Sequence, residues 1–410
     1  MVEWKTIKVG DIGQIITGKT PKTSNGSYYG GEIPFLTPSD DMSVKYVRNT
    51  KKNITEEGRI SVKNATLPPN TVCVSCIGSD LGKVVITTEM TVTNQQINSI
   101  VIDEDNYDID YIYYSMVELG KILNFHSKTS TAVPIVNKSS FSQYELKCPP
   151  LDIQKKIGEV LSSIDSKIEE NDNINKNLEQ QAQAIFKEWF IDNPENNEWS
   201  TGTFSELIKS TLNGDWGKEA PTGNNTEKVY CIRGADIPEV KAGNKGKMPT
   251  RYILPKNFAT KQLTAGDIVV EISGGSPTQS TGRCTAITQS LLDRYDSGMV
   301  CTNFCKAIKP KEGYSLFICY YWQYLYGKGV FFSYENGTTG IKNLDFSGFI
   351  ETKTILIPPV DKVIAFDDYC KSIFNQIFAN GKQNEHLAVL RDTLLPKLMS
   401  GELDVSDIDL

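Results

Sequence analysis

A segment of about forty residues occurs twice in this chain and constrains its fold more than any other feature. Each copy follows a proline pair, Pro149-Pro150 or Pro358-Pro359, and the copies are related by a constant offset of 209 residues. Proline pairs end the preceding structure. After each pair, apolar side chains recur at alternating steps of three and four, the a/d pattern of a coiled coil. The repeat therefore predicts two long helices that pair with each other.

The predicted contact line between these helices carries two asparagines at matching positions in each copy. Asparagine buried in such a seam costs stability but fixes register and partner number. Asn171/Asn175 and Asn380/Asn384 can hydrogen-bond to each other if the helices run antiparallel. The alternative is two ordinary surface helices, each packed on its own half. The predicted seam consists of Ile157, Leu161, Ile164, Ile168, Asn171, Asn175, Leu178, Ile185, Phe366, Ile373, Ile377, Asn380, Asn384, Leu387 and Leu394.

The segments that precede the two helices are also related to each other. Residues 67–78 align with residues 263–274 at an offset of 196, and each reads as a turn, a short β-rich run and a glycine turn. Trp4 and Trp199 begin the two segments in the same way. The chain therefore contains two similar globular halves as well as two similar helices.

Further downstream the two halves remain comparable but contain an insertion. Thr93-Asn94 recurs as Thr302-Asn303, and helices are predicted at 109–124 and 315–327. Short Val-, Ile- and Tyr-rich runs punctuated by Gly, Pro and Asn indicate strands around them. The halves are therefore predicted to be mixed α and β.

Together these patterns predict an α+β fold with a pseudo-twofold internal repeat, in which two globular domains are joined by two long antiparallel coiled-coil helices. The predicted boundaries are a first domain at 1–150, a first helix at 151–195, a second domain at 196–358, and a second helix with its tail at 359–410.

The net charge of −7 is unevenly placed along the chain. Residues 1–150 carry −1 and residues 199–359 carry +4, whereas 151–198 and 360–410 carry −6 and −4. Because the local field and not the overall charge decides attraction to DNA, the two domains are compatible with DNA binding.

Neither a membrane span nor a signal peptide is predicted. No apolar run reaches the length that crosses a bilayer, and the first residues lack a basic and apolar leader, so the chain is expected to be cytoplasmic. The nine cysteines are then expected to be reduced. Cys73/Cys76 and Cys301/Cys305 have no matching second pair and the chain holds two histidines, so no metal site is predicted.

Two similar domains held on a constant helical frame suit a target whose read sites lie a fixed distance apart, and duplex DNA is such a target. The order of domains and helices, over essentially the whole chain, resembles the specificity subunits of type I restriction–modification systems. The segments that carry the resemblance are residues 4–12, 17–21, 31–40, 149–157, 229–237 and 263–270. The second half departs at Asn213-Gly214-Asp215, which replaces Gly18-Lys19-Thr20, and at Pro358-Pro359-Val360, which lacks the Gln-Lys-Lys that follows the first pair.

This resemblance implies a non-catalytic subunit that takes part in defence against foreign DNA. Each domain would be a target-recognition domain reading one half of a bipartite site in double-stranded DNA. Two modification (methyltransferase) subunits would dock along the helices, and restriction/translocase subunits would join for cleavage. No cofactor is expected on this chain, because the methyl donor, Mg and ATP belong to those partners.

Residues that contact DNA are expected in polar, glycine-rich loops with basic and aromatic side chains. In the first domain the candidates are Lys19, Thr20, Lys22, Asn25, Tyr28, Tyr29, Ser79, Lys128, Thr129 and Ser130. In the second they are Arg233, Lys241, Lys245, Lys247, Arg251, Ser276, Thr278, Gln279, Arg283, Asn336, Thr338 and Lys342.

The alternatives to a DNA-recognition scaffold are a nucleotide-binding enzyme, an adenine methyltransferase and a structural protein. Residues 13–20 match the phosphate-loop pattern of a nucleotide-binding enzyme, but Pro21 follows at once and no helix is expected at Lys19-Thr20, which that chemistry requires. The proline pairs lack the Asn/Asp-Pro-Pro-aromatic motif of an adenine methyltransferase. The remaining alternative is a structural protein whose domains bind other proteins.

Overall fold

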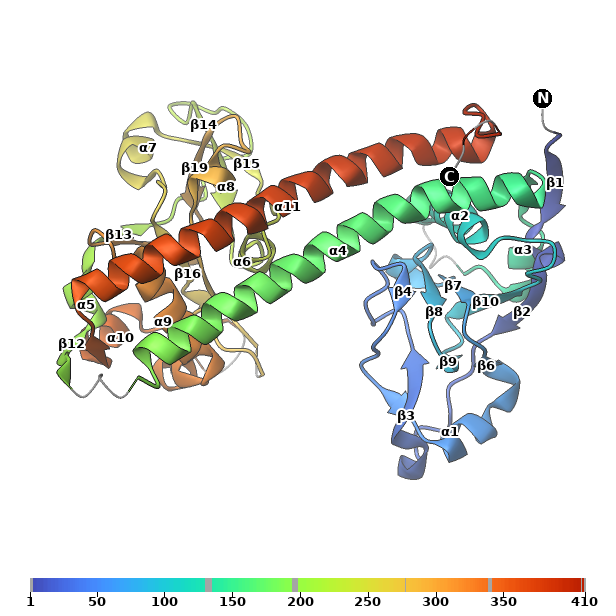
Figure 1. Cartoon of the computed structure of the whole chain (residues 1–410), viewed down its shortest axis with the longest axis horizontal. Coiled ribbons are helices and arrows are strands. Elements are labelled where there is room, and N and C mark those ends of the chain that lie inside the picture. The colour runs from blue at the N-terminus through green and yellow to red at the C-terminus, as the bar shows by residue number, and fades with distance from the viewer. Residues whose placement is uncertain are drawn as a thin grey trace. The chain divides into compact units, whose positions relative to one another are not determined.

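The computed structural model describes residues 3–129, 135–193, 198–276, 278–337, 341–406 and 408 (Figure 1). The chain forms two compact units, one made of Met1–Lys167 with Leu387–Leu410 and the other of Ile168–His386. Two long helices, α4 (Leu151–Phe190) and α11 (Val360–Ser400), each contribute residues to both units. We call residues 3–150 the first head and residues 198–359 the second head.

The first head is built on a five-stranded sheet with the order β2-β10-β7-β8-β4. All five residues of β7 are buried, because the sheet is covered on both faces and α2 packs against β7 and β8. A four-stranded sheet, β5-β3-β9-β6, and the pair β1-β11 complete the head. The strands are β1 (Lys5–Lys8), β2 (Gly13–Thr17), β3 (Tyr29–Leu36), β4 (Tyr46–Val47), β5 (Asn53–Ile54), β6 (Thr66–Leu67), β7 (Thr71–Ser75), β8 (Val84–Thr87), β9 (Thr91–Thr93), β10 (Ile97–Ile102) and β11 (Glu145–Cys148), and the helices are α1 (Glu56–Ser61), α2 (Ile109–Thr129) and α3 (Lys138–Ser142).

The second head is built on a four-stranded sheet with the order β13-β20-β16-β18, together with the sheets β15-β14-β19, β17-β22-β21 and β12-β23. The strands are β12 (Ser200–Thr203), β13 (Ile208–Asn213), β14 (Glu227–Ile232), β15 (Thr250–Ile253), β16 (Ile268–Glu271), β17 (Ser273–Gly274), β18 (Cys284–Ala286), β19 (Gly298–Cys301), β20 (Cys305–Pro310), β21 (Glu335–Asn336), β22 (Lys342–Leu344) and β23 (Thr354–Ile357). The helices are α5 (Phe204–Leu207), α6 (Ile237–Lys241), α7 (Pro255–Lys261), α8 (Gln289–Leu292), α9 (Ser315–Gly327) and α10 (Phe346–Thr352).

Each head contains its own main sheet, and the two sheets have equivalent strand order and strand directions. In the first, β10 pairs antiparallel with β2 and β7, and β7 pairs with β8; in the second, β20, β13, β16 and β18 repeat these pairings. In each head an antiparallel pair also joins the first strand to the last, β1 to β11 and β12 to β23. The predicted internal repeat and mixed α+β class are therefore confirmed.

The backbone contacts correct part of the sequence alignment by one residue. The N–H of Lys19 donates to the carbonyl of Thr93 at 2.8 Å, and the N–H of Asp215 donates to that of Cys301 at 2.8 Å. Thr93 therefore corresponds to Cys301, not to Thr302, and Lys19 corresponds to Asp215. A pattern match of two polar residues cannot fix register, which strand pairing decides.

The helical predictions agree with the structure. The helix predicted at 315–327 is α9, and the one predicted at 109–124 is α2, which continues to Thr129. The long helices begin at Leu151 and Val360, directly after the proline pairs. No helix in the described part of the chain is long and apolar enough to cross a membrane.

Within each unit, the parts of α4 and α11 run antiparallel and side by side (Figure 1). In the second unit the expected asparagine hydrogen bonds are present, because Asn171 donates to Asn384 and Asn380 donates to Asn175, each at 2.8 Å. In the first unit the same line carries an ion pair between Arg391 and Asp165 at 2.7 Å.

The side chains of the predicted seam also contact the heads. Ten of the fifteen are buried, and Ile168, Leu178, Ile185, Leu387 and Leu394 are half-buried. Phe366, for example, meets the rings of Phe190 on α4 and Tyr320 on α9, with centroids 5.2 and 5.6 Å away. In each unit the long helices therefore contribute to the largest apolar core of the head.

Candidate nucleic-acid interface

In the first head, several candidate loops meet at one end of the main sheet. Strand β2 ends at Thr17, whose hydroxyl donates to Asn98 at 2.6 Å. The Asn98 amide donates to the carbonyl of Val136 at 3.1 Å, and the Cys76 carbonyl accepts from the N–H of Val136 at 2.9 Å. The loops after β2 and β7 and the segment before α3 therefore share one edge.

The polar side chains at this edge include three that the sequence singled out, Lys19, Thr20 and Lys22, and one that it missed, Gln95. Thr20 donates from its hydroxyl to the amide oxygen of Gln95 at 2.7 Å. Lys19 and Lys22 are exposed, and neither forms an ion pair with any residue that the structure describes. These two ammonium groups remain available to phosphate oxygens.

Other candidates in the first head have structural partners. Asn25 accepts from the N–H of Ser27 at 3.2 Å and caps a short turn, while the Tyr29 hydroxyl donates to the carbonyl of Pro21 at 2.7 Å. Tyr28 is half-buried. Ser130 of the first head and Thr338 of the second head lie outside the described residues. The side chains of Ser79, Lys128 and Thr129 are also outside the described part.

In the second head, the small sheet β17-β22-β21 brings two candidate loops together. Ser273 pairs with Asn343, and Asn343 pairs with Asn336, which is exposed. The loop that follows β17, with Gly275, Ser276 and residues 278–283, leaves this sheet, and Gly337 and Ile341 lie beside it next to β21 and β22. Within the first loop, the Ser276 hydroxyl accepts from the N–H of Gln279 at 3.1 Å, and Thr278 and Gln279 are exposed.

Most candidate cations of the second head already have a carboxylate partner. Lys247 is exposed and forms no ion pair within the described ranges. The paired cations are Arg233 with Asp236, Lys241 with Glu179, Lys245 with Glu385, Arg251 with Glu219, Arg283 with Glu271 and Lys342 with Glu335. Hydrogen bonds to Asp236 and Glu271 raise the pKa values of Arg233 and Arg283, so both remain charged.

A pocket of about 630 Å³ lies where these loops meet. Its lining includes Arg233 and Arg283 together with Trp216, Phe304 and Ile341. The three apolar side chains are all exposed, Ile341 by 61%. Sequence reasoning missed all three, because apolar residues in loops carry no local signal of exposure.

The phosphate-loop match has none of the required geometry. Residues Gly13–Thr17 form strand β2 within the main sheet, and the next helical turn along the chain begins only at Gly26. Lys19 and Thr20 therefore do not lie at a helix N-terminus, where a phosphate would be bound. No group of three or more His, Cys, Asp or Glu that could hold a metal ion occurs among the described residues.

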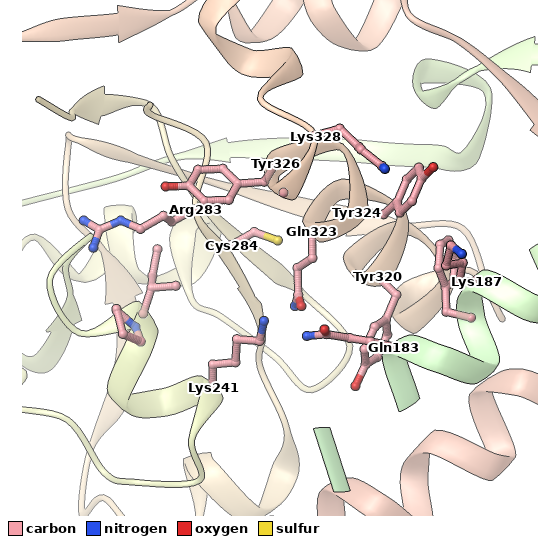
Figure 2. A pocket seen from close by; sticks show the side chains of 14 residues that line it. Gln183, Lys187, Lys241, Arg283, Cys284, Tyr320, Gln323, Tyr324, Tyr326 and Lys328 are labelled. Carbon is pink, nitrogen blue, oxygen red and sulfur yellow. The ribbon is translucent and has the colours of Figure 1, made fainter. Parts of the chain in front are cut away.

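A second pocket of about 550 Å³ lies between α9, α6 and α4 in the second unit (Figure 2). Figure 2 shows Gln183 and Lys187 of α4 on one side, with Tyr320 and Tyr324 of α9 beside them. Lys328 follows α9 at the rim. The pocket combines tyrosine rings with several cations.

The first unit contains a corresponding pocket of about 570 Å³. Tyr113, Gly120 and Lys121 line it, and at an offset of 207 they match Tyr320, Gly327 and Lys328 of the other pocket. From the long helices, Asp392 and Leu395 of α11 take the places of Gln183 and Phe186 of α4 at the offset of 209. We call these two pockets the paired clefts.

Comparisons with known proteins identify the class. A model of the family described as "Type I restriction modification DNA specificity domain" matches residues 1–180. The chain is 28% identical to the type I restriction enzyme MjaIX specificity subunit of Methanocaldococcus jannaschii, over 99% of this chain and 95% of that protein. It is 34% identical to the HindI specificity subunit of Haemophilus influenzae, over 38% of this chain and 34% of that protein.

The fold agrees with these matches. The crystal structure of a type I restriction–modification S subunit from M. genitalium superposes with a TM-score of 0.55 at 15% identity, covering 99% of this chain and 97% of that one. Residues 1–180 therefore match the DNA specificity domain of type I restriction–modification systems, and the whole chain is similar to a specificity subunit of such a system. It is the DNA-sequence-recognition subunit of such a complex, whose catalysis resides on the modification and restriction subunits, and no cofactor is expected on this chain.

Proposed function

We propose that each head reads one half of a bipartite site in double-stranded DNA through the edge of its main sheet. The observation that carries this proposal is the repetition of that edge in both heads with different exposed side chains. Gly18-Lys19 packs on Thr93-Asn94 as Gly214-Asp215 packs on Cys301-Thr302. A shared backbone with divergent loops suits the reading of two different half-sites.

Ten of the predicted residues with at least partly exposed side chains are proposed to contact DNA. In the first head these are Lys19, Thr20, Lys22 and Tyr28, and in the second they are Arg233, Lys247, Thr278, Gln279, Arg283 and Asn336. Gln95, Asn303, Trp216, Phe304 and Ile341 are added from the structure. Because such a complex acts on DNA in the cell, we place the chain in the cytoplasm.

The test is methylome sequencing of a host that expresses this chain with its modification subunit, compared with a deletion of this chain. The proposal predicts a bipartite motif with a non-specific gap that depends on the chain. Insertion of one heptad into both long helices should lengthen the gap and leave both half-sites unchanged. Absence of a chain-dependent motif, or a changed half-site after the insertion, contradicts the proposal.

We further propose that the paired clefts are docking sites for two copies of the modification subunit. A cleft that occurs once in each unit, with Tyr113, Gly120 and Lys121 repeated as Tyr320, Gly327 and Lys328, suits one segment presented twice. The lysine that the two clefts have in common, Lys121 in one and Lys328 in the other, favours an acidic segment. Restriction/translocase subunits would then join the assembled complex.

Lys121→Glu and Lys328→Glu test this docking proposal. Each change reverses the charge of one cleft, so each should lower the number of bound modification subunits from two to one. The double variant should bind none. Native mass measurement of the complex gives the stoichiometry, and two bound subunits in both single variants would exclude the clefts as docking sites.

A further inference from the structure

Two arginines that line the pocket at the edge of the second head are each held by a buried carboxylate. Arg283 donates from Nε and Nη2 to the two oxygens of Glu271 at 2.8 and 2.6 Å. Arg233 donates from Nε and Nη2 to Asp236 at 2.9 and 3.0 Å. Both carboxylates are nearly inaccessible to solvent, with 4% and 2% of the residue exposed.

The carboxylates leave part of each guanidinium free. A guanidinium has five N–H donors in a rigid fork, and Glu271 occupies two of those of Arg283. The Nη1 group and one hydrogen of Nη2 remain, which together form the edge that pairs with O6 and N7 of guanine. Gln279, an exposed loop residue, can turn its amide oxygen to Nε and Nη1 at 3.2 and 3.3 Å, and DNA would displace it.

Arg233 has fewer free N–H donors than Arg283. Its Nη2 also donates to the carbonyl of Lys247 at 2.7 Å, so only Nη1 remains available. Arg233 can therefore offer donors from a single nitrogen to a base or a phosphate, whereas Arg283 can offer a two-nitrogen fork. The two side chains line the same pocket.

The position of Glu271 is fixed by its surroundings. A Cβ atom at Gly234 or Gly274 would lie 2.6 or 2.9 Å from its Oε1, so the carboxylate fills the space that a side chain would need. A guanidinium held in this way has little rotamer freedom left to lose when it binds a base. The pair is therefore suited to selective recognition rather than to general charge attraction.

The pocket walls add an apolar surface around the fork. The Trp216 ring is held by the Arg251 guanidinium, 3.9 Å from the ring centre, and Phe304 and Ile341 are exposed. Apolar walls that exclude water strengthen a hydrogen bond made beside them. At the corresponding position of the first head, Thr20 replaces Trp216 and Gln96 replaces Phe304.

The first head also lacks the arginine–carboxylate pair. Ser75 and Lys83 exchange the same backbone contacts as Glu271 and Arg283, since the N–H of Ser75 donates to the Lys83 carbonyl and that of Glu271 to the Arg283 carbonyl. Lys83 pairs instead with Asp80 at 2.6 Å. At this position of the main sheet, the fork therefore occurs in the second head and not in the first.

We propose that Arg283, oriented by Glu271, reads O6 and N7 of a guanine in the half-site of the second head, with Arg233 as an adjacent donor. This inference rests on the proposed function and specifies it further. It requires at least one G·C pair in that half-site. It makes Arg283 a specificity-determining residue and Glu271 the residue that positions it.

The test replaces each guanine of the two half-sites in turn by 7-deazaguanine, which lacks N7, and measures binding by the complete modification complex. This change leaves the protein intact, so misfolding cannot account for a loss. At one guanine we expect a loss of about tenfold in affinity, because one of two hydrogen bonds to the fork disappears.

The assignment to Arg283 comes from the same measurement on the double variant Arg283→Leu, Glu271→Leu, which removes the fork together with its buried carboxylate. In this variant, 7-deazaguanine at that position should cause no further loss. Lys309→Gln is the matched control, since Lys309 pairs with buried Asp267 at 2.8 Å away from the pocket, and it should retain the full tenfold effect.

Two results would overturn the inference while leaving the bipartite function intact. The half-site of the second head is the one that changes when residues 199–359 are exchanged for those of a relative. One contradicting result is a motif in which this half-site contains only A·T pairs. The other is an equal effect of 7-deazaguanine on the unmodified protein and on the double variant Arg283→Leu, Glu271→Leu. Absence of any motif contradicts the proposed function itself.

Discussion

In the first head, Ser75 and Lys83 occupy the positions that Glu271 and Arg283 occupy in the second, and their backbone hydrogen bonds are the same. The side chains differ completely. Lys83 is 44% exposed and pairs with a surface carboxylate, whereas Arg283 is held by a carboxylate that is almost fully buried.

This difference extends to the other candidate cations. Lys19 and Lys22 of the first head are exposed and form no ion pair within the described part of the chain, while Arg233, Arg283 and Lys342 of the second head are paired. The same backbone edge therefore presents exposed lysines without ion pairs in the first head and mainly carboxylate-held donors in the second. The first arrangement favours phosphate contact and the second favours base recognition.

The largest expected effect on stability is that of Arg283→Ala. Removal of the arginine leaves the Glu271 carboxylate buried without its cation, so the free energy of unfolding of the second unit should fall by about 3 kcal/mol. Lys83→Ala removes a surface pair and should change that of the first unit by less than about 0.5 kcal/mol. Denaturant unfolding measures both, and equal losses would show that the two positions do not differ as described.

A second prediction concerns the equivalent glycines of the two heads, Gly18 and Gly214. A Cβ atom at Gly18 would lie 2.1 Å from the carbonyl oxygen of Asn94, and one at Gly214 would lie 1.9 Å from that of Thr302. Because neither backbone can move away cheaply, Gly18→Ala and Gly214→Ala should each destabilise their unit by about 2 kcal/mol. Gly26→Ala, which meets no atom within 4 Å, is the control. If one variant lost much more stability than the other, Gly18 and Gly214 would not be structurally equivalent.

The polar contacts between the two long helices also differ between the units, with asparagine hydrogen bonds in the second unit and an ion pair in the first. Asn380→Leu in the second unit leaves the amide oxygen of Asn175 without its donor and should cost about 1–2 kcal/mol. The double variant Asn175→Leu, Asn380→Leu should cost less than the sum of the single changes, because the two residues interact. Thermal unfolding of the three variants checks this, and additive losses would argue against the hydrogen bond.

Lys19→Ala should have a smaller effect, confined to DNA binding. A lysine that contacts one phosphate contributes about one unit to the slope of log affinity against log salt concentration. The variant should therefore lose affinity for all sequences alike and reduce this slope by about one, with unchanged unfolding. A loss that differs between half-site sequences would instead make Lys19 a base-reading residue.

The smallest difference between the units is expected in their thiols. All nine cysteines are buried, and burial raises the pKa of Cys73 in the first unit and of Cys305 in the second to about 12. A thiol with this pKa is almost entirely protonated at pH 8, so the native chain should not react with a thiol reagent until it is denatured. Rapid reaction of native thiols in one unit would reveal local opening there.

The sequence by itself determined the arrangement of the chain. The heptad spacing, the proline pairs and the offsets of the repeats are local patterns, and they correctly predicted α4, α11, the asparagine hydrogen bonds and two related α+β heads. They also indicated polar loops as the candidate interface, and both heads gather such loops at one sheet edge.

Only the tertiary structure decided which side chains of those loops are free to act. Arg251 lies against Trp216, Lys241 against Glu179 and Lys342 against Glu335, and the sequence shows none of these pairs. Glu271 meets Arg283 across paired strands, so their contact depends on strand register and turn length. Such register is set by hydrogen bonds between distant segments, which no local pattern of residues encodes.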